Sequence, residues 1–194
     1  MMAITCVDAY RTLRKGNENY VTGQSTHPNT DISAREKVVD GQHPFAVVLC
    51  CSDSRVVPEL IFDTGIGDLF VIRVAGNVLD DAIIASIEYA VANLGSSLVV
   101  VLGHEKCGAV TAAVNQVAGG HLIALTDKIN PAIDQAQQQD GDLVDNSIRQ
   151  NAINMAEQLQ KSAPVLRPQY EAKTLKILPA YYALTTGKVA FLKG

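Results

Sequence analysis

Two short segments of the sequence carry side chains that bind metal ions and handle protons. One is CSDSR at residues 51–55, and the other is HEKCG at residues 104–108. Within them, Cys51, His104 and Cys107 offer two sulfurs and one imidazole nitrogen, a set that suits a zinc ion. Three protein ligands leave the fourth tetrahedral position of zinc open, as in catalytic sites. Together the two segments predict a catalytic metal centre.

Each segment directly follows a run that is typical of a buried parallel strand. Residues 44–50 (PFAVVLC) and 97–103 (SLVVVLG) are short, continuous, apolar and rich in β-branched side chains. Ligands of an open α/β sheet gather beyond the carboxyl ends of its strands. We therefore expect both segments to meet at one edge of a sheet.

A helix is expected after each segment. Pro58 fits the first turn of a helix, where its missing N–H is not needed, and residues 109–117 form an apolar run after the second segment. Cys107 would then lie at a helix N-terminus, where the positive end of the helix dipole favours a thiolate over a thiol.

The remaining cysteines have a simpler interpretation. Side chains alternate along a strand, so Cys50 should point away from Cys51. We expect Cys50 and Cys6 to be core or surface thiols. Either metal-binding segment alone could be explained by a core role of its cysteine or by coincidence. A metal site is favoured because both segments occur together, each after an expected strand and before an expected helix.

The two segments resemble the Cys-x-Asp-x-Arg and His-x-x-Cys motifs of the β class of carbonic anhydrases. The similarity extends along most of the chain, through GNENY at residues 16–20, GDLFVIRVAGN at 67–77 and TGKV at 186–189. The resemblance implies one zinc ion per chain on the three ligands named above. It also implies a carbonate dehydratase, a zinc lyase that hydrates carbon dioxide reversibly to bicarbonate by attack of zinc-bound hydroxide, working as a homodimer or an assembly of dimers.

The same resemblance implies that Asp53 and Arg55 form the catalytic dyad. Asp53 would accept a hydrogen bond from the hydroxide and orient it, and the planar guanidinium of Arg55 would hold the carboxylate in place. Part of the family has a closed state in which this aspartate is the fourth zinc ligand. The alternative without a catalytic role is an ordinary salt bridge in a loop.

The resemblance further implies that the substrate pocket is lined by Gln42, Phe70, Tyr89 and Gly108. Helical geometry gives Tyr89 separate support, because it lies about 120° from the centre of the apolar stripe of a helix expected over residues 78–94. That stripe consists of Ile83, Ile87, Ala90 and Leu94. The family covers such a ring with the neighbouring subunit, and a partly exposed tyrosine is the alternative.

One branch of the family is inhibited by bicarbonate at a second site, which uses a tryptophan three residues before the first cysteine. This chain has Val48 there and contains no tryptophan, although Arg73 matches the arginine of that site. We therefore predict the open form of the site, with Asp53 paired to Arg55.

The pattern of apolar runs predicts an α/β fold: a mostly parallel four-stranded sheet with an added edge strand, flanked by helices, and an N-terminal helical arm. The expected strands are residues 44–50, 69–74, 97–103 and 175–180, with the edge strand at 189–192. Further helices are expected at 6–21 and 31–40, and two within 121–161. In this family such an N-terminal arm commonly wraps a partner subunit.

Two prolines and a glycine-containing stretch predict local features of the helices and strands. Pro131 and residues 140–142 (DGD) should break the segment 121–161 into its two helices. Pro179 removes a donor from the sheet ladder, so it should lie at an edge or a strand end.

Length favours a single domain over residues 1–194. A chain of this size should bury roughly 70% of the surface that its unfolded form exposes, which is enough for one core. We divide it into a helical arm, the zinc-site core, a helical segment and C-terminal strands, at residues 1–40, 41–118, 119–173 and 174–194.

Composition and charge exclude several classes of function. A net charge of −4 without a Lys/Arg block argues against nucleic-acid or membrane-surface binding. No apolar run reaches membrane-spanning length, and residues 1–6 lack the basic start of a signal peptide. Four cysteines, two of them adjacent, do not suggest disulfides, and thiolate ligands favour a reducing compartment. We therefore expect the cytoplasm.

Two other functions fit the same residues. The scaffold could hydrolyse another linear heterocumulene, such as carbon disulfide or carbonyl sulfide, as some relatives do, and the sequence does not show that difference. Alternatively the zinc ion only stabilises the fold, which requires a fourth protein ligand and gives Arg55 no role. His43 and His121 are the candidates for a proton carrier because histidine titrates near neutrality, and surface exposure is the simpler explanation for both.

Overall fold

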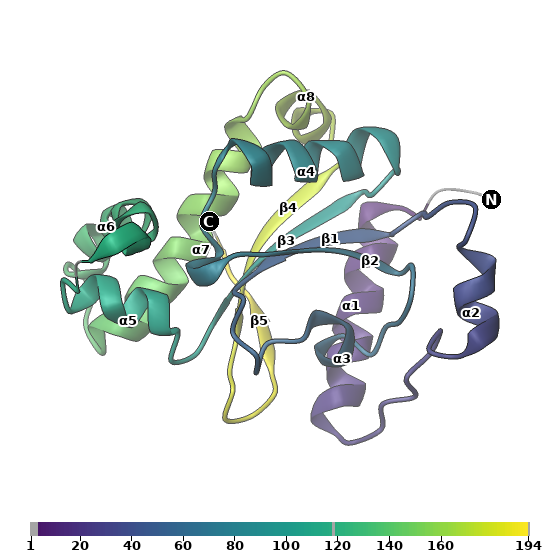
Figure 1. Ribbon diagram of the computed structural model, residues 1–194, viewed down its shortest axis with the longest axis horizontal. Helices are drawn as coiled ribbons and strands as arrows, with labels where there is room; N and C mark the ends of the chain where they lie inside the picture. The colour runs from purple at the N-terminus through teal and green to yellow at the C-terminus, as the bar shows by residue number, and fades with distance from the viewer. Residues whose placement is uncertain (1–3, 118, 194) are drawn as a thin grey trace.

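A five-stranded sheet forms the centre of the computed structural model, which describes residues 4–117 and 119–193. Its strands are β1 (Ala46–Cys50), β2 (Leu69–Arg73), β3 (Leu98–His104), β4 (Lys176–Tyr182) and β5 (Val189–Phe191). The order is β2-β1-β3-β4-β5; the first four strands are parallel, and β5 pairs antiparallel with β4 (Figure 1). The predicted α/β fold with an added edge strand is confirmed.

Eight α-helices and two short 3₁₀ turns surround the sheet in the described part of the chain. The helices are α1 (Cys6–Val21), α2 (Ile32–Lys37), α3 (Pro58–Ile61), α4 (Asp81–Asn93), α5 (Gly108–Val114), α6 (Ile123–Ala136), α7 (Leu143–Lys161) and α8 (Leu166–Glu171). The 3₁₀ turns are η1 (Ala75–Asn77) and η2 (Gly120–Leu122). Of the described helices, none combines the length and apolar character that crossing a membrane requires. Residues 1–3, used above to argue against a signal peptide, lie outside the described residues.

Helices cover both faces of the sheet. Val47 and Leu49 of β1 pack with α4 and α7. Val48 and Cys50 point to the other face and pack with α1 and α3. Figure 1 shows α4 above the sheet and α1 below it. This two-sided burial explains the continuous apolar runs of the inner strands. It also confirms Cys50 as a core residue that points away from Cys51, which belongs to a different buried cluster.

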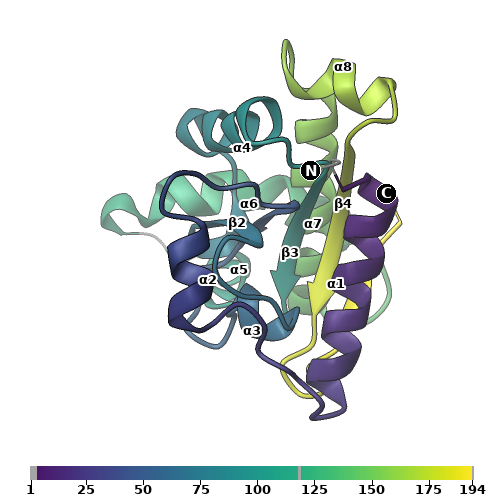
Figure 2. The same cartoon turned by 90° about the vertical axis from the view of Figure 1, so that its right-hand side faces the viewer.

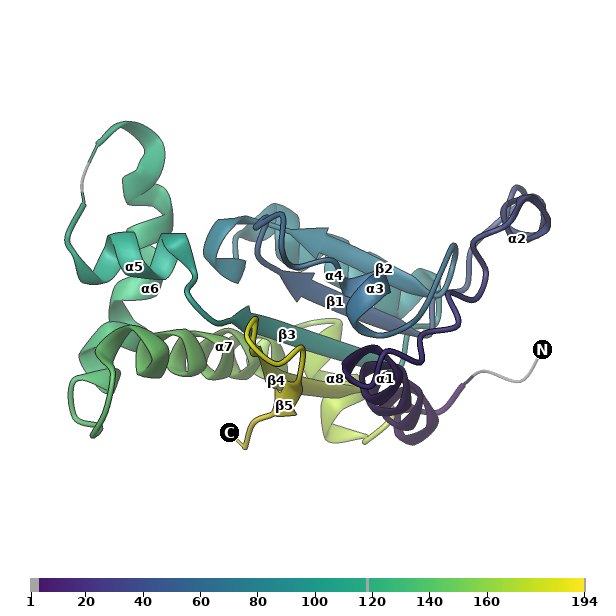
Figure 3. The ribbon, with the colours of Figure 1, turned by 90° about the horizontal axis from the view of Figure 1, so that it is seen from below.

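The carboxyl ends of β1 and β3 lie at the same edge of the sheet. The two strands are parallel neighbours, paired from Ala46↔Leu98 to Cys50↔Leu102. Figure 2 shows β3 and β4 side by side and running in the same direction, and Figure 3 shows the arrowheads of β1 and β3 pointing toward the side where α5 and α6 lie. Both metal-binding segments of the sequence begin at this edge.

Pro131 does not break a helix, so that expectation is wrong. It lies inside α6, and the chain turns instead between α6 and α7, where Asp142 caps α7 by accepting a hydrogen bond from the N–H of Asp145. Proline removes one hydrogen bond from a helix interior. The helix continues because Ile129 and Ile133, on either side of the proline, are buried against α5 and α7.

Pro179 lies within β4, at a position where β4 is not yet paired with β5. The N–H of Leu192 donates to the carbonyl of Pro179, so the backbone of Pro179 faces the β5 side. On that side the pairing with β5 begins only at Ala180, which pairs with Phe191. The missing donor is therefore not needed by a partner strand, because on this side β4 is still an edge at Pro179.

Helix α1 packs on the chain's own sheet. Ala9 and Leu13 are fully buried in the cluster that includes Leu98. At Gly16, a Cβ atom would lie 1.7 Å from the carbonyl oxygen of Phe62, just after α3. Only glycine allows this close approach of the two backbones. The expected N-terminal arm is thus docked within the chain, and its contact with a partner subunit stays a prediction.

Replacing Gly16 by alanine should destabilise the fold. The added methyl group meets a backbone carbonyl, which cannot turn aside as a flexible side chain would, so the free energy of unfolding should fall by about 3 kcal/mol. Gly41→Ala is the matched control, because a Cβ there has nothing within 4 Å, and its effect should stay within about 0.5 kcal/mol. Urea unfolding followed by circular dichroism measures both. Equal stability of the two variants would contradict the docking of α1.

Candidate metal centre

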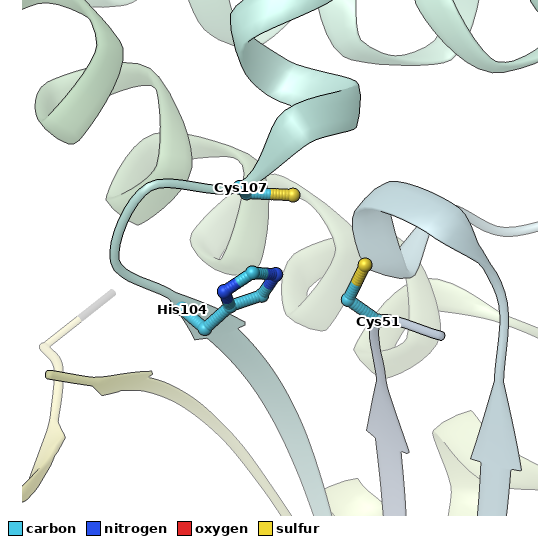
Figure 4. A group of neighbouring side chains, drawn as sticks. All are labelled: Cys51, His104 and Cys107. Carbon is cyan, nitrogen blue, oxygen red and sulfur yellow. The ribbon is translucent and has the colours of Figure 1, made fainter. Parts of the chain in front are cut away.

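The three predicted ligands come from two neighbouring strands and the loop that follows one of them. Cys51 directly follows β1, His104 is the last residue of β3, and Cys107 immediately precedes α5. Because β1 and β3 are parallel neighbours, these positions converge at one edge of the sheet. Figure 4 shows the imidazole of His104 reaching toward the space between the two sulfurs.

The three side chains form a compact, buried group. Their ligand atoms all lie within 4.8 Å of one another, and each residue is buried. A tetrahedral zinc ion with bonds of about 2.0 to 2.3 Å holds its ligand atoms less than about 4 Å apart. Small movements of side chains would therefore bring these three atoms onto one ion.

His104 is fully buried and presents a free nitrogen to this group. Its Nδ1 lies 3.0 Å from the carbonyl oxygen of Glu105, and because a carbonyl only accepts, Nδ1 carries the hydrogen. The other nitrogen, Nε2, then has a lone pair and has no hydrogen-bond partner among the described residues. A buried polar atom without a partner is costly, and a histidine held in this tautomer is typical of a metal ligand.

The thiols of Cys51 and Cys107 shift each other's pKa strongly. The contact with Cys107 holds the pKa of the Cys51 thiol below its usual range, whereas the same contact and burial raise the pKa of Cys107. The N–H groups of Val110 and Ala109 lower the pKa of Cys107, as expected at a helix start, but this effect is the smaller one. Without a cation the pair therefore keeps one proton, and a divalent ion is needed for both sulfurs to ionise.

Cys50, the neighbour of Cys51, has a different character. Burial raises the pKa of its thiol to about 12, and its side chain lies in the core between the sheet and α1. It therefore stays protonated at neutral pH and takes no part in the metal-binding group.

Asp53 and Arg55 form a bidentate ion pair beside this group. The Nε and Nη2 atoms of Arg55 donate to Oδ1 and Oδ2 of Asp53 at 2.9 and 2.7 Å, and its backbone N–H donates to Oδ1 at 3.0 Å. These bonds hold the pKa of the Asp53 carboxyl well below its usual range. Oδ2 lies 3.9 Å from Nε2 of His104, although Asp53 is not a member of the three-residue group. The expected pairing of Asp53 with Arg55 is present, and the open form of the site and the catalytic role of the pair stay predictions.

Arg73 supports this loop in a way that the sequence did not reveal. Its Nε and Nη2 atoms both lie 3.2 Å from the carbonyl oxygen of Cys51, and Nη2 also donates to the carbonyl oxygen of Asp53 at 2.7 Å. Arg73 ends β2, where it pairs with Cys50 on β1. This role could have been predicted only by knowing that β1 and β2 are neighbouring strands, and a single sequence does not show that.

The loop from β3 to α5 is held from two sides. The carboxylate of Glu105 accepts hydrogen bonds from the N–H and the hydroxyl of Thr185, at 2.9 and 3.1 Å. Its backbone N–H donates to the carbonyl of Tyr182 at the end of β4. Arg55 adds a longer bond of 3.4 Å to the carbonyl of Lys106. These contacts fix the two ligands that flank the loop.

Three of the four predicted pocket residues lie away from the metal-binding group within one chain. Phe70 is paired with Val47, four residues before Cys51, which along a strand is a distance of about 13 Å. Tyr89 lies near Phe70, with 6.4 Å between ring centroids, and is 50% exposed. Gln42 is exposed and precedes β1. Of the four, Gly108 alone adjoins a ligand, as the first residue of α5.

Comparisons with known proteins agree on one family. The family model described as Carbonic anhydrase matches residues 46–189. A carbonic anhydrase of Mycolicibacterium smegmatis is 38% identical over 188 residues, covering 94% of this chain and 91% of that protein. The solved β-carbonic anhydrase CcaA is 27% identical with a TM-score of 0.73, and the match covers 95% of both chains. A tetrameric β-carbonic anhydrase of Sordaria macrospora is 24% identical with a TM-score of 0.76, covering 95% of this chain and 96% of that one.

Replacing one ligand should abolish metal binding, whereas replacing a cysteine outside the group should not. We expect the purified wild type to hold about one zinc ion per chain, Cys107→Ser to hold almost none, and Cys6→Ser to match the wild type. Metal content measured by mass spectrometry tests this. A chelator should lower the melting temperature of the wild type and of Cys6→Ser but not that of Cys107→Ser. Equal zinc in the two variants would exclude Cys107 as a ligand.

Proposed function

The chain belongs to the β-carbonic anhydrase family and is a carbonate dehydratase, and we propose that its catalytic metal is zinc, held by Cys51, His104 and Cys107. The observation that supports this most directly is the buried Nε2 atom of His104, which has no hydrogen-bond partner in the described part of the chain and lies with two sulfurs. When bound, zinc would act as a Lewis acid that lowers the pKa of water to about 7 and so makes a nucleophile available at neutral pH.

We propose that Asp53 orients the water-derived nucleophile that attacks carbon dioxide. Its Oδ2 atom lies beside the ligand group, 3.9 Å from Nε2 of His104, so it can accept a hydrogen bond from a molecule placed there. An ionised carboxylate only accepts hydrogen bonds. The hydrogen of the nucleophile would therefore point to Asp53 and its lone pair toward the substrate.

Arg55 has two roles in this proposal. Its bidentate bonds keep the Asp53 carboxyl ionised, so that the acceptor is present throughout the neutral range. They also hold Asp53 in place, which prevents it from moving to occupy the open coordination position. A lysine at this position would offer a single point charge and could not fix the carboxylate plane.

The alternative of a purely structural metal has less support. A structural zinc site has four protein ligands, whereas the group within the described residues has three members. The carboxylate of Asp53, which lies 3.9 Å from Nε2 of His104, is engaged by Arg55.

We propose further that a second copy of the chain completes each substrate pocket, in a homodimer or an assembly of dimers. Gln42, Phe70 and Tyr89 lie toward the opposite end of β1 from the metal-binding group, so the same chain does not bring them to its own site. The half-exposed ring of Tyr89 offers an apolar surface that a partner would cover. The structurally similar proteins of Sordaria macrospora are tetrameric.

The chain organisation and the compartment follow from the same site. We propose that residues 1–194 act as one domain, because the metal-binding loops are held by contacts from β2 and from the turn after β4. Two ionisable thiols as ligands favour a reducing environment, which supports the cytoplasm as the place of action.

Replacing Asp53 by asparagine should remove activity without removing the metal. The amide keeps the shape of the side chain but loses its charge and its pairing with Arg55, so carbon dioxide hydration should slow by about 100-fold or more. Stopped-flow hydration from pH 7 to 9, with zinc content measured on the same samples, tests this. Asp134→Asn, an exposed position on α6, is the control and should match the wild type.

The outcomes separate the competing functions. Full zinc content with a large rate loss in Asp53→Asn alone supports the proposed role of Asp53. A fully active Asp53→Asn variant would contradict it. A wild type with full zinc content and negligible activity across this pH range would support a structural metal instead.

Mixing Asp53→Asn with Tyr89→Ala, which should itself lose activity if Tyr89 lines a substrate pocket, tests whether pockets are shared between chains. In a dimer of one Asp53→Asn chain and one Tyr89→Ala chain, both defects fall in one site and the other site is intact, if Tyr89 serves the partner. Random pairing then restores about a quarter of the wild-type activity per chain. No recovery, in a mixture shown by native mass spectrometry to contain the mixed dimer, would place Tyr89 in its own chain's site.

A further inference from the structure

Helix α7 carries two polar side chains on its buried face. Ser147 and Asn151, one helical turn apart, are both fully buried, although the other buried residues of this helix are apolar. A buried amide costs free energy unless its hydrogen bonds are made. The Oδ1 atom of Asn151 has no hydrogen-bond partner among the described residues, so the bond made by its Nδ2 atom has to explain its position.

Asn151 is linked to the metal-binding group through one backbone residue. Its Nδ2 atom donates to the carbonyl oxygen of Gly76 at 2.9 Å, across 75 residues of sequence. The N–H of Gly76 in turn donates to the sulfur of Cys51, with 3.4 Å between the nitrogen and Sγ. The side chain of α7 thus holds the residue whose N–H points at a ligand sulfur.

The backbone around Gly76 needs such support. Gly76 and Asn77 have φ values of 72° and 43°, so two successive residues adopt left-handed conformations, which for a residue other than glycine is unfavourable. A Cβ atom on Gly76 would lie 2.9 Å from Cδ1 of Ile129, so α6 confines it as well. A single 3₁₀ turn has no long ladder of hydrogen bonds to fix its orientation.

We propose that Asn151 is a positioning residue that sets the hydrogen bond from Gly76 to the sulfur of Cys51 and thereby tunes this sulfur as a metal ligand. The inference rests on the proposed zinc site. An N–H directed at a thiolate withdraws electron density from the sulfur, and partners of this kind orient a ligand and adjust its strength. Asn151 acts on the metal only through the peptide unit of Gly76.

A purely structural role for Asn151 makes a different prediction. If the amide only filled space between α7 and η1, its replacement would lower stability but leave the sulfur unchanged. Met155→Ala is the matched control for this effect, because Met155 is buried on the same helix and packs against the sheet, away from Gly76. Asn154→Ala controls for the loss of a polar side chain, since among the described residues the side chain of Asn154 bonds to Gln150 of its own helix and not to Gly76.

The first test uses the wild type and needs no substitution. In protein loaded with cadmium-113, a hydrogen bond from Gly76 to the ligand sulfur should transmit a measurable nuclear spin coupling from the metal to the Gly76 amide proton. We expect this coupling in the wild type and its loss in Asn151→Leu, which keeps the approximate size of the side chain but has no donor for the carbonyl of Gly76. Its absence from the cadmium-loaded wild type would overturn the proposal.

The second test reads the sulfur directly. In the cobalt(II) form, Asn151→Leu and Asn151→Ala should move the sulfur-to-cobalt charge-transfer band to lower energy, because a sulfur without its hydrogen bond gives up an electron more easily. Metal release to a chelator should be about 10- to 100-fold faster than in the wild type, because the ligand sulfur also loses the backbone contact that orients it. Met155→Ala and Asn154→Ala should keep the band of the wild type.

The outcomes distinguish this inference from the proposed function. A wild type that binds neither cobalt nor zinc would overturn both. A wild type that binds metal, together with Asn151 variants whose band and release rate equal those of Met155→Ala, would overturn the role of Asn151 and leave the zinc site in place. A shift confined to the Asn151 variants supports the positioning role.

Discussion

The sulfurs of Cys51 and Cys107 and the Nε2 atom of His104 lie together in a buried place, and the rest of the site depends on how that group is satisfied. A single proton shared between the sulfurs leaves the imidazole nitrogen without a partner. One divalent cation satisfies all three atoms at once and makes ionisation of both thiols favourable. Burial of these three polar atoms, which costs free energy without an ion, then favours tight binding, because few water molecules compete for the ion.

Backbone contacts from several distant segments keep the ligands in place. Arg73 at the end of β2 holds the carbonyls of Cys51 and Asp53, and Glu105 ties the loop after β3 to Thr185. Each of these bonds joins a ligand-bearing loop to a neighbouring element, so the geometry of the site is a property of the whole sheet edge. This arrangement is what a metal centre needs, since small errors in ligand position weaken binding strongly.

Part of the fold and of the metal-binding site could be predicted from the sequence, and part could not. The strands and the three-residue group could be predicted, because apolar runs and closely spaced polar residues are local signals, and the pairing of Asp53 with Arg55 was implied by the resemblance to the family. The contacts that Arg73 and Asn151 make beside the site were not predicted, since they depend on which strand and which helix lie there. The same limit explains Pro131: a local rule predicts a break, but burial of the flanking isoleucines between α5 and α7 maintains the helix.

The adjacent cysteines at the end of β1 have a consequence for how the protein acquires its ion. Since Cys50 points into the core on the opposite face and its pKa is raised to about 12, it cannot compete with Cys51 for an incoming metal. Nor can the two neighbours readily cross-link under oxidation, because their side chains diverge. Because successive side chains of a strand point to opposite faces, Cys51 is available to bind the metal. Cys50, which has the same chemistry, is kept from binding it in the wrong place.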